Sequence, residues 1–427
     1  MHNDLEFKSS LTSFRYRILG ISVAMAFILY LDRVCLGEIV KGQAFLNEFA
    51  TDKQAVGRVL AAFFFSYALF QIPAGWLSDR YGARTTLTIY IIGWSILTGL
   101  TGFATSLSGL LLARLACGIA QAGAYPTSSG LIRKWFSREQ RGSASGWISM
   151  GGRIGGTVAP FLTAFLVIQL GDWRSVLYLY CFLGLLVAWG YYTIVRNPEE
   201  NRNGQMPIAE KTKVRDIFPM LLACSVNRSL WLNSFSQFGV NIGWVFLITW
   251  LPTYLREEKN MDSLVGAAMV SFVLAVGIPG QIIGGYASDL SVRRFGLRIG
   301  RVLVPAVSSV IAGIAYIGCL GFDSVWIIVG CCAIVSIMTD IGNPSSWAFI
   351  QDVGGRNTSA IHGWTNMWGN FGASFGALMV PTLLSWGKSS GNGQAMVFAA
   401  CSGAFILSAL AMLGMDATKP VQPASQE

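Results

Sequence analysis

The stretch GWLSDRYGAR, residues 75–84, lies between two long apolar runs and recurs in looser form as GGYASDLSVRRFG at residues 284–296. Each copy places an aspartate four residues after a glycine, followed by arginines and a further glycine. The two aspartates, Asp79 and Asp289, are roughly 210 residues apart. A charged loop that returns at this interval between apolar runs predicts an internally duplicated chain.

The apolar runs around these loops indicate the class of the protein. The chain has 427 residues, of which 53% are hydrophobic and 12% charged, whereas soluble domains carry about twice that charged fraction. A helix that crosses a membrane needs roughly 20 apolar residues. Twelve such segments are predicted, at residues 17–37, 55–77, 86–105, 108–132, 143–168, 174–195, 229–255, 264–287, 300–320, 325–350, 358–385 and 393–415. The fold class is therefore an all-α polytopic membrane protein embedded in a lipid bilayer.

The remaining composition favours no metal, cofactor or nucleic acid. Seven of the eight cysteines fall within predicted spans, where they act as small apolar side chains, and the two histidines make no metal-ligand spacing. Lys and Arg gather in the N-terminal tail and in alternate loops, which places those loops and both termini in the cytoplasm. The net charge of +9 therefore reflects topology. We expect a multi-pass protein of the cell membrane, most simply a bacterial inner membrane.

One long polar stretch, residues 196–228, separates six predicted spans from six. We therefore predict an N-terminal half at residues 1–195, a cytoplasmic linker at 196–228 and a C-terminal half at 229–427. A second repeated motif supports the duplication, because RGSASGW (141–147) and RNTSAIHGW (356–364) each open the fifth span of their half. Parallel repeats of this kind describe transporters with the substrate site at mid-membrane between the halves.

The loop at residues 75–84 resembles the signature of the major facilitator superfamily, Gly-x-x-x-Asp-Arg-x-Gly-x-Arg. The resemblance implies twelve helices in two halves and a cytoplasmic latch in which Asp79 binds the start of the helix near Thr358 and Ser359. The charged residues expected to gate the transporter are Asp79, Arg80, Arg84, Arg141, Arg153 and Asp289, with Arg84 and Arg141 completing the cluster around Asp79. Ordinary positive-inside residues are the alternative interpretation.

Five charged residues stand out within the predicted spans: Asp32, Arg33, Arg114, Arg153 and Asp340. Each costs about 2.5 to 3.5 kcal/mol at a helix centre, so each requires a reason. Three cations against two anions favour an anionic substrate, whose carboxylate an arginine binds through two parallel hydrogen bonds.

Helical spacing gathers further polar residues on common faces. Arg114, Gly118, Gln121 and Tyr125 share one face, and so do Tyr30 and Arg33. Gln237, Asn241 and Trp244 repeat the spacing, as do Asn366 and Asn370. Such a lining suits a small, hydroxyl-rich carboxylate.

Several short motifs resemble the anion:cation symporter branch of the superfamily, which includes galactonate, glucarate and hexuronate transporters. They are YLDR (30–33), SYALFQIPAGW (66–76), ARLACGIAQAGAYP (113–126), SQFGV (236–240), ITWLPTYL (248–255) and WGNFG (368–372). The resemblance implies that Tyr30, Arg33, Tyr67, Gln237, Ser346 and Asn370 contact the substrate, with Arg114 as a partner and Asp32 as a protonation site. Gln121 and Asn241 complete the predicted substrate-binding set. Helix packing is the alternative role for these Gln, Asn and Ser residues.

Two positions depart from the sugar-acid branch. Gln121 stands where the branch usually has a glutamate that carries a proton, and glutamine does not titrate. Either Asp32 carries the proton alone, or Asp340 does, or the protein is not proton-coupled. We favour Asp32, because its protonation would free Arg33 from its pairing with the Asp32 carboxylate. Arg153 is predicted to pair with Asp340 as a gate, to clamp the substrate, or to form a fixed structural ion pair.

The sequence thus predicts a monomeric secondary transporter that takes up a small organic anion with protons by alternating access. The alternatives are phosphate-like or dicarboxylate anions with sodium coupling, an exporter, or a non-transporting sensor on the same fold. A membrane enzyme would require a nucleophile–base pair or metal cluster, and the sequence shows neither.

Overall fold

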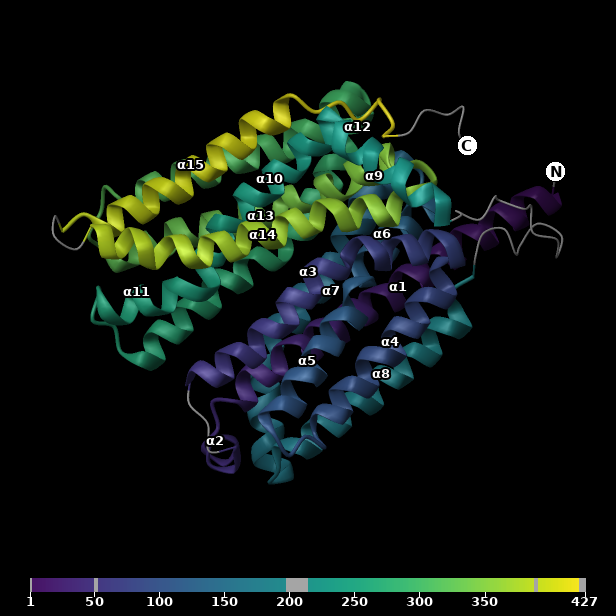
Figure 1. Cartoon of the computed structure of the whole chain (residues 1–427). Coiled ribbons are helices and arrows are strands. Elements are labelled where there is room, and N and C mark those ends of the chain that lie inside the picture. Colours follow the sequence, from purple (N-terminus) through teal and green to yellow (C-terminus); the bar gives the residue numbers. More distant parts are fainter. Residues whose placement is uncertain (1, 50–52, 197–213, 388–390, 422–427) are drawn as a thin grey trace. The chain divides into compact units, whose positions relative to one another are not determined.

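The computed structural model describes residues 2–49, 53–196, 214–387 and 391–421 (Figure 1). Every regular element within these residues is a helix. The α-helices are α1 (His2–Ile39), α2 (Gln43–Phe49), α3 (Lys53–Tyr81), α4 (Ala83–Thr101), α5 (Leu107–Ala122), α6 (Ala124–Trp135), α7 (Arg141–Leu170), α8 (Trp173–Ile194), α9 (Ile217–Val226), α10 (Arg228–Val245), α11 (Leu251–Glu257), α12 (Ser263–Gly318), α13 (Val325–Val353), α14 (Thr358–Trp386) and α15 (Gly393–Leu413). The short elements are η1 (Arg138–Gln140), η3 (Val214–Asp216), η4 (Phe246–Trp250) and η5 (Gly355–Asn357).

All twelve predicted segments are helical, so the all-α prediction is confirmed. Within the described residues, nine helices are long and apolar enough to cross a membrane. The long helix α12 is one of these nine and covers two predicted segments, 264–287 and 300–320. The two predicted segments outside the nine are α4 and α14, and α14 carries the amides of Asn366 and Asn370.

Two predicted segments are interrupted within the membrane. The segment at 108–132 divides at Gly123, where α5 ends and α6 begins. The segment at 229–255 passes from α10 through the π-helical turn η4 into α11, which has a proline in its first turn. Such π-turns are rare and frequently lie at functional sites.

The second glycine of each repeated loop supports a turn that other residues rarely adopt. Gly82 has φ 87° at the junction of α3 and α4, and Gly296 has φ 76° inside α12, where it separates the two arms of that helix. A side chain would be strained at a positive φ, so glycine is required at both places. The duplicated motif therefore encodes the same backbone turn twice.

The chain divides into two compact units by its internal contacts. Unit 1 comprises Met1–Ser137, Trp147–Phe218 and Arg356–Gly363, and unit 2 comprises Arg138–Gly146, Pro219–Gly355 and Trp364–Glu427. Each unit therefore includes a short segment from the other half of the sequence, namely the start of α14 in unit 1 and the start of α7 in unit 2. Residues 197–213 of the predicted linker lie outside the described residues, and its remainder forms η3 and α9.

Glycines bring an equivalent pair of helices together in each unit. In unit 1, Gly151 and Gly155 of α7 lie against the backbone of α1 at Val23 and Phe27. In unit 2, Gly372 and Gly376 of α14 lie against the backbone of α10 at residues 238 and 242. Small residues permit this close approach of membrane helices, so the duplication extends from the loops into the packing.

Apolar side chains fill each unit and also cover the outside of its helices. The core of unit 2 is built around Tyr316, Phe246 and Phe398. Large apolar residues such as Phe161 and Ile168 are more than three-quarters exposed. A soluble protein rarely leaves such residues in contact with water, whereas a helix surrounded by lipid requires them.

The short helix α2 is joined to the start of α8 by an exposed ion pair. The carboxylate of Glu48 accepts hydrogen bonds from the Trp173 indole at 3.2 Å and from Arg174 Nη1 at 2.7 Å. The Arg174 guanidinium holds the pKa of Glu48 below its usual value. Glu48 lies outside the membrane-spanning segments, and Arg174 lies in the first turn of one of them. The pair serves below as a reference for buried pairs.

Candidate functional site

The guanidinium of Arg33 lies in a box of aromatic rings inside unit 1. Its central carbon is 4.8 Å from the ring centre of Tyr30, 5.3 Å from that of Phe63 and 4.3 Å from that of Tyr67. Phe63 and Tyr67 stack on each other at 5.8 Å on α3. Such rings attract a cation through their negative faces, so they hold the Arg33 head group without neutralising it.

One side of the Arg33 head group is bonded and another is not. Its Nε donates to Gln121 Oε1 at 3.2 Å. Its Nη2 is buried and has no hydrogen-bond partner among the described residues. Gln121 reaches Arg33 because Gly118, one turn earlier on α5, lies directly against the backbone of α3 at residues 63 and 67. Arg33 therefore retains a donor for an anion.

Asp32 points away from Arg33, since successive side chains on a helix are about 100° apart. It is 1% exposed, and the cation that acts on it is Arg114. Neither carboxylate oxygen makes a hydrogen bond within the described residues. The Trp94 indole N–H is close to the carboxylate but does not have the geometry of a hydrogen bond. Arg114 in turn donates from Nη2 to the Arg33 carbonyl at 3.3 Å. The predicted pairing of Asp32 with Arg33 is therefore wrong, and Arg114 is the counter-ion.

Tyr125 and Arg153 extend the aromatic wall next to Arg33. The rings of Tyr30 and Tyr125 are 6.1 Å apart. Because Gly152 of α7 has no side chain, the Tyr125 hydroxyl and the Tyr30 ring can lie directly against it. The charge of Arg153, the next residue, acts on Tyr125. Arg153 thus lies near the predicted substrate residues of unit 1, and its pairing with Asp340 of unit 2 stays a prediction.

The predicted amides of unit 2 are gathered where α14 crosses α10. Gly369 of α14 faces both Gln237 and Asn241, and a methyl group there would come within 3.1 Å of Asn241 Nδ2. Asn241 Nδ2 donates to the Gln237 carbonyl at 2.8 Å, and Asn370 Nδ2 donates to the Asn366 carbonyl at 2.7 Å. Each asparagine therefore uses its NH2 group within its own helix, which leaves its carbonyl oxygen to accept from hydroxyl groups.

Ser346 and Asp340 both lie on α13 in unit 2 and are almost completely buried. Ser346 follows Ser345, whose hydroxyl donates to the Arg301 carbonyl at 3.0 Å. Asp340 Oδ1 accepts a hydrogen bond from Gln281 Nε2 at 2.8 Å. Both residues are thus placed inside the unit, at different depths along one helix.

Asp79 binds the start of α14 within unit 1. Its carboxylate accepts from the backbone N–H of Ser359 at 3.1 Å and of Ala360 at 2.9 Å. Gly75, one turn earlier, lies so close to the Ser359 carbonyl that a methyl group would collide with it. The free N–H groups and dipole of a helix N-terminus favour an anion. The resemblance to the family implied this contact for Asp79; its gating role stays a prediction.

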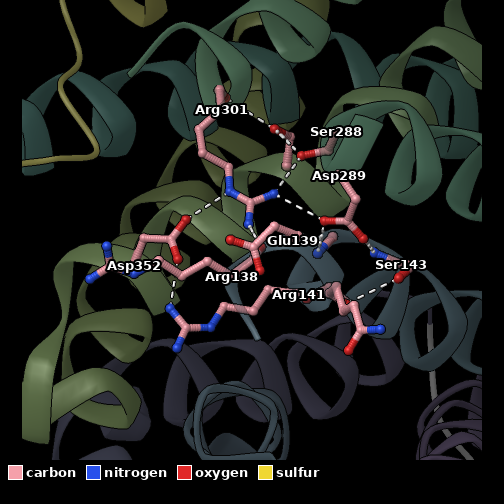
Figure 2. A network of polar contacts seen from close by, with 12 residues as sticks. Arg138, Glu139, Arg141, Ser143, Ser288, Asp289, Arg301 and Asp352 are labelled. Carbon is pink, nitrogen blue, oxygen red and sulfur yellow. Dashed lines mark hydrogen bonds and ion pairs between the residues drawn. The ribbon is translucent and has the colours of Figure 1, made fainter. Parts of the chain in front are cut away.

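Asp289 makes the equivalent contacts within unit 2 (Figure 2). Its carboxylate accepts from the backbone N–H of Gly142 at 2.8 Å and of Ser143 at 2.7 Å, at the start of α7. Gly285 lies against the Gly142 carbonyl, as Gly75 does against that of Ser359. The repeated Gly-x-x-x-Asp therefore encodes one structural element, a carboxylate that caps a helix from the opposite half of the sequence.

A buried arginine distinguishes the second cap from the first. Figure 2 shows Arg301, which is fully buried, between two carboxylates: its Nη1 is 3.2 Å from Asp289 Oδ1 and its Nε is 2.7 Å from Asp352 Oδ2. Asp352 Oδ1 also binds Arg141 Nη1 at 2.6 Å. Arg301 further donates to the backbone carbonyl of Arg138. Two arginines and two aspartates thus balance each other.

The sequence interpretation missed Arg301 and Asp352. Arg301 belongs to the Lys- and Arg-rich loops that the sequence assigns to the cytoplasm, and no motif in the sequence singles out Asp352. One signal was present, because a single aspartate, Asp289, could not balance the arginines between 293 and 301. A second carboxylate at the end of a neighbouring helix would have been the corresponding expectation.

The other predicted gating arginines have different partners from those expected. Arg84 was grouped with Asp79, but its Nε donates to the Tyr192 carbonyl at 2.9 Å and its guanidinium lies over the Tyr192 ring. Arg141 was grouped with Asp79 as well, and it belongs instead to the Arg301 network of unit 2. Arg80 lies over the ring of Trp76, one turn earlier. The prediction that Arg84 and Arg141 complete a charge cluster around Asp79 is therefore corrected.

Comparison with known proteins places this geometry in a family. A model of the major facilitator superfamily matches residues 22–377 of the chain. The chain belongs to the major facilitator superfamily. Membership in this family makes it a multi-pass membrane transporter and not an enzyme.

Among the curated relatives of this major facilitator protein is a probable sulfoacetate transporter of Cupriavidus necator, 29% identical over 82% of this chain and 83% of the relative. A probable galactarate/D-glucarate transporter of Bacillus subtilis is 25% identical over 94% of this chain and 92% of the relative. A D-galactonate transporter of Escherichia coli is 25% identical over 94% of both chains.

Solved structures confirm the major facilitator fold. The human organic anion transporter MFSD10 matches with a TM-score of 0.70 and 15% identity over 93% of this chain and 99% of that chain. A proton:xylose symporter matches with a TM-score of 0.71 and 15% identity over 93% of this chain and 95% of that chain. At this identity the likeness concerns the fold alone, which has twelve transmembrane helices in two six-helix halves.

Proposed function

We propose that this major facilitator protein takes up a small organic anion, a sugar acid such as an aldonate or a hexuronate, across the cell membrane. One observation carries the proposal: Arg33 is held by aromatic rings in unit 1 and keeps a buried donor, Nη2, without a partner among the described residues. An anion that replaces this missing partner gains a charge-assisted hydrogen bond. The names of the sugar-acid relatives support the same class of substrate.

The amides of unit 2 supply the second part of the proposed recognition. Gln237, Asn241 and Asn370 would accept and donate hydrogen bonds to substrate hydroxyl groups, as Tyr30 and Tyr67 would from unit 1. Sites that bind hydroxyl groups through buried polar residues reject analogues that lack those groups. We therefore expect the transporter to prefer hydroxylated acids over simple fatty acids of equal length.

We further propose that protons drive uptake and that Asp32 is one carrier. Protonation of Asp32 removes the counter-charge of Arg114, and Arg114 binds the carbonyl of Arg33. The protonation state of Asp32 would therefore influence Arg33 through Arg114 and the backbone of α1. Coupling of this kind requires only that substrate and proton change each other's affinity.

In the proposed cycle, a monomer with both termini in the cytoplasm alternates between outward-open and inward-open states. The two sequence halves, residues 1–195 and 229–427, move against each other, and the caps at Asp79 and Asp289 hold one of these states. Within each unit, the glycines of α7 and α14 allow close contact with a neighbouring helix, which would keep the helices of one half together as it moves. Reversing the charges of Arg153 and Asp340 together tests whether that predicted pair is a gate.

A small dianion is the second candidate substrate. The relative named for sulfoacetate supports it, and so does the position of Arg153 near Tyr125, which would supply a second cation beside Arg33. Dicarboxylates belong to the same chemical class.

Counterflow with the purified protein in proteoliposomes tests the proposed function. Vesicles are loaded with one of a panel of aldonates, uronates, aldarates and sulfoacetate, and labelled acid is added outside. We expect exchange with at least one hydroxylated acid, independent of sodium. When a pH gradient drives net uptake into the same vesicles, this uptake should be faster at pH 6 than at pH 8. A panel without any exchange would contradict the proposal, and exchange of sulfoacetate alone would favour the dianion.

A further inference from the structure

Asp340 lies at the middle of α13 in a setting that the mechanism above leaves unused. It is fully buried, 15 residues after the start of the helix and 13 before its end. Gln281 of α12 donates from Nε2 to Asp340 Oδ1 at 2.8 Å. Asn343, one turn further along α13, donates to Gln281 Oε1 at 3.3 Å. The second contact fixes the Gln281 amide, so its NH2 group faces the carboxylate.

The other carboxylate oxygen lies beside a serine hydroxyl and a glycine. Ser336 is one turn before Asp340 on the same face of α13, and its hydroxyl is buried without a hydrogen-bond partner among the described residues. A methyl group on Gly277 of α12 would lie 2.8 Å from Ser336 Oγ and would collide with Asp340 Oδ2. Both oxygens therefore approach the same point above Gly277, and only glycine leaves them that space.

This arrangement can bond either protonation state of Asp340. A serine hydroxyl both donates and accepts. Ser336 Oγ and Asp340 Oδ2 are not hydrogen-bonded to each other in this structure. A change of the Ser336 rotamer would let the hydroxyl donate to Oδ2 of the ionised carboxylate, or accept from Oδ2 when that oxygen carries a proton. Gln281 donates to Oδ1 in both states. A group that must gain and lose a proton in each cycle needs such a surrounding.

The unit 2 elements that pack against α13 carry few charged residues, and those of α12 begin at Asp289 and include Arg301. From Ser263 to Ser288, α12 contains no Asp, Glu, Lys, Arg or His, and Tyr286 is exposed. The only charged residue of α10 is Arg228, at its first position. On α13 itself the other ionisable groups are Cys331, Cys332 and Asp352, the last about 18 Å further along the helix. From unit 1, Arg153 is the cation that the sequence predicts as a partner.

We propose that Asp340 is a second proton-binding site of the transport cycle, with Gln281 and Ser336 as positioning residues. The inference rests on the proposed proton-coupled uptake and supplies the titratable group that Gln121 does not provide. Each cycle would convert the Asp340 carboxylate to the acid on one side of the membrane and return the proton on the other. With Asp32 as the first site, two protons accompany one monovalent anion, so one net positive charge enters.

The test measures how the membrane potential drives uptake in proteoliposomes. For one net charge, a potential of 100 mV, negative inside, raises the accumulation ratio about 50-fold. Asp340→Asn imitates the protonated state permanently and should abolish this dependence while counterflow stays within about twofold of wild type. Asp323→Asn, an exposed residue just before α13, is the matched control and should retain the full potential dependence.

Two further variants separate titration from a structural role. Asp340→Glu keeps an ionisable group and should restore potential-driven uptake at least in part, with a shifted pH profile. Gln281→Leu removes the donor to Oδ1 and should shift the pH profile of uptake without loss of counterflow. If Asp340→Asn loses counterflow as well, restoration of both activities by Asp340→Glu still supports the proposal, and failure of both overturns it.

The remaining outcomes are equally decisive. Full potential dependence in Asp340→Asn overturns the inference but leaves the proposed uptake intact. Uptake driven by a sodium gradient and lost in Asp340→Asn overturns the proton assignment. Absence of counterflow in the wild-type protein with every acid would contradict the proposed function itself, which distinguishes that failure from failure of the Asp340 site.

Discussion

The caps at Asp79 and Asp289 share one backbone design and differ in their charges. In both, a carboxylate accepts two backbone N–H groups at a helix start, and a glycine one turn earlier permits the close approach. In unit 1 the cation whose charge acts on Asp79 is Lys134, while in unit 2 the buried Arg301 binds Asp289 directly. The duplication therefore preserved the geometry while the electrostatics diverged.

This difference has consequences for stability. A charge at a helix N-terminus gains about 0.3–1 kcal/mol at an exposed site and up to about 2 kcal/mol when partly buried. Breaking a buried ion pair by removing one partner costs about 3–5 kcal/mol, because the other charge stays buried without compensation. We therefore expect unit 2 to depend on its cap more strongly than unit 1.

The largest effect is expected from Arg301→Ala. It leaves Asp289 and Asp352 buried with Arg141 alone, which should destabilise the protein by about 3–5 kcal/mol. The measurement is thermal unfolding of the purified protein in detergent, with Arg301→Lys as the conservative variant. Arg298→Ala is the matched control, since Arg298 is exposed and lies 3.9 Å from Asp416. An unfolding temperature equal to that of wild type in Arg301→Ala would show that the network does not stabilise unit 2.

Asp289→Asn should destabilise the protein more than Asp79→Asn does. This difference should be smaller than the loss of stability expected from Arg301→Ala. Asparagine keeps the shape of the cap and removes its charge. Asp289→Asn leaves Arg301 to share Asp352 with Arg141, at an expected cost of about 2–3 kcal/mol. Asp79→Asn loses mainly the helix-dipole interaction, at about 1 kcal/mol. Equal unfolding temperatures for the two variants would contradict the proposed difference between the caps.

The shared backbone design predicts equal effects of Gly75→Ala and Gly285→Ala. Each added methyl group would collide with a backbone carbonyl, of Ser359 in one case and of Gly142 in the other. Overpacking of this kind costs about 1–3 kcal/mol. Unfolding temperatures of the two variants should fall together, with Gly57→Ala, which meets no atom within 4 Å, as the control. A large inequality would mean that the close approach matters in only one cap.

The smallest effect concerns the exposed pair of Glu48 and Arg174, which gives a reference for the buried pairs. Because Arg174 lowers the pKa of Glu48, the pair stabilises the folded state above the usual pKa of a glutamate and loses this contribution as pH falls below it. Glu48→Gln should therefore reduce the unfolding temperature slightly at pH 7 and not at pH 3. A loss as large as that of Arg301→Ala would contradict the distinction between exposed and buried pairs.

Much of this architecture could be predicted because it depends on local patterns. The apolar runs predicted the twelve segments, and helical periodicity predicted that Gln121 shares a face with Arg114 and Tyr125. These features follow from residues a few turns apart, which a sequence displays directly. The contact of Asp79 with the start of the helix near Ser359 was implied by the resemblance to the family.

The remainder depends on contacts between distant segments. The Arg301 network joins the start of α7, the end of α13 and the two arms of α12, and no local pattern predicts Asp352 as a member. The prediction that Arg33 is the counter-ion of Asp32 failed because adjacent residues on a helix point in different directions. The break at Gly123 was missed because the apolar run continues through it. Tertiary packing determined each of these.

The central claim is that Arg33 binds the carboxylate of the transported acid, and counterflow with Arg33 variants tests it most directly. Arg33→Gln removes the charge and the fork of donors, and loss of such a partner should reduce exchange of the preferred acid by at least about 30-fold. Arg256→Gln, an exposed arginine of α11 beside Glu257, should exchange the acid as wild type does. Wild-type exchange by Arg33→Gln for every acid that the transporter accepts would contradict the account.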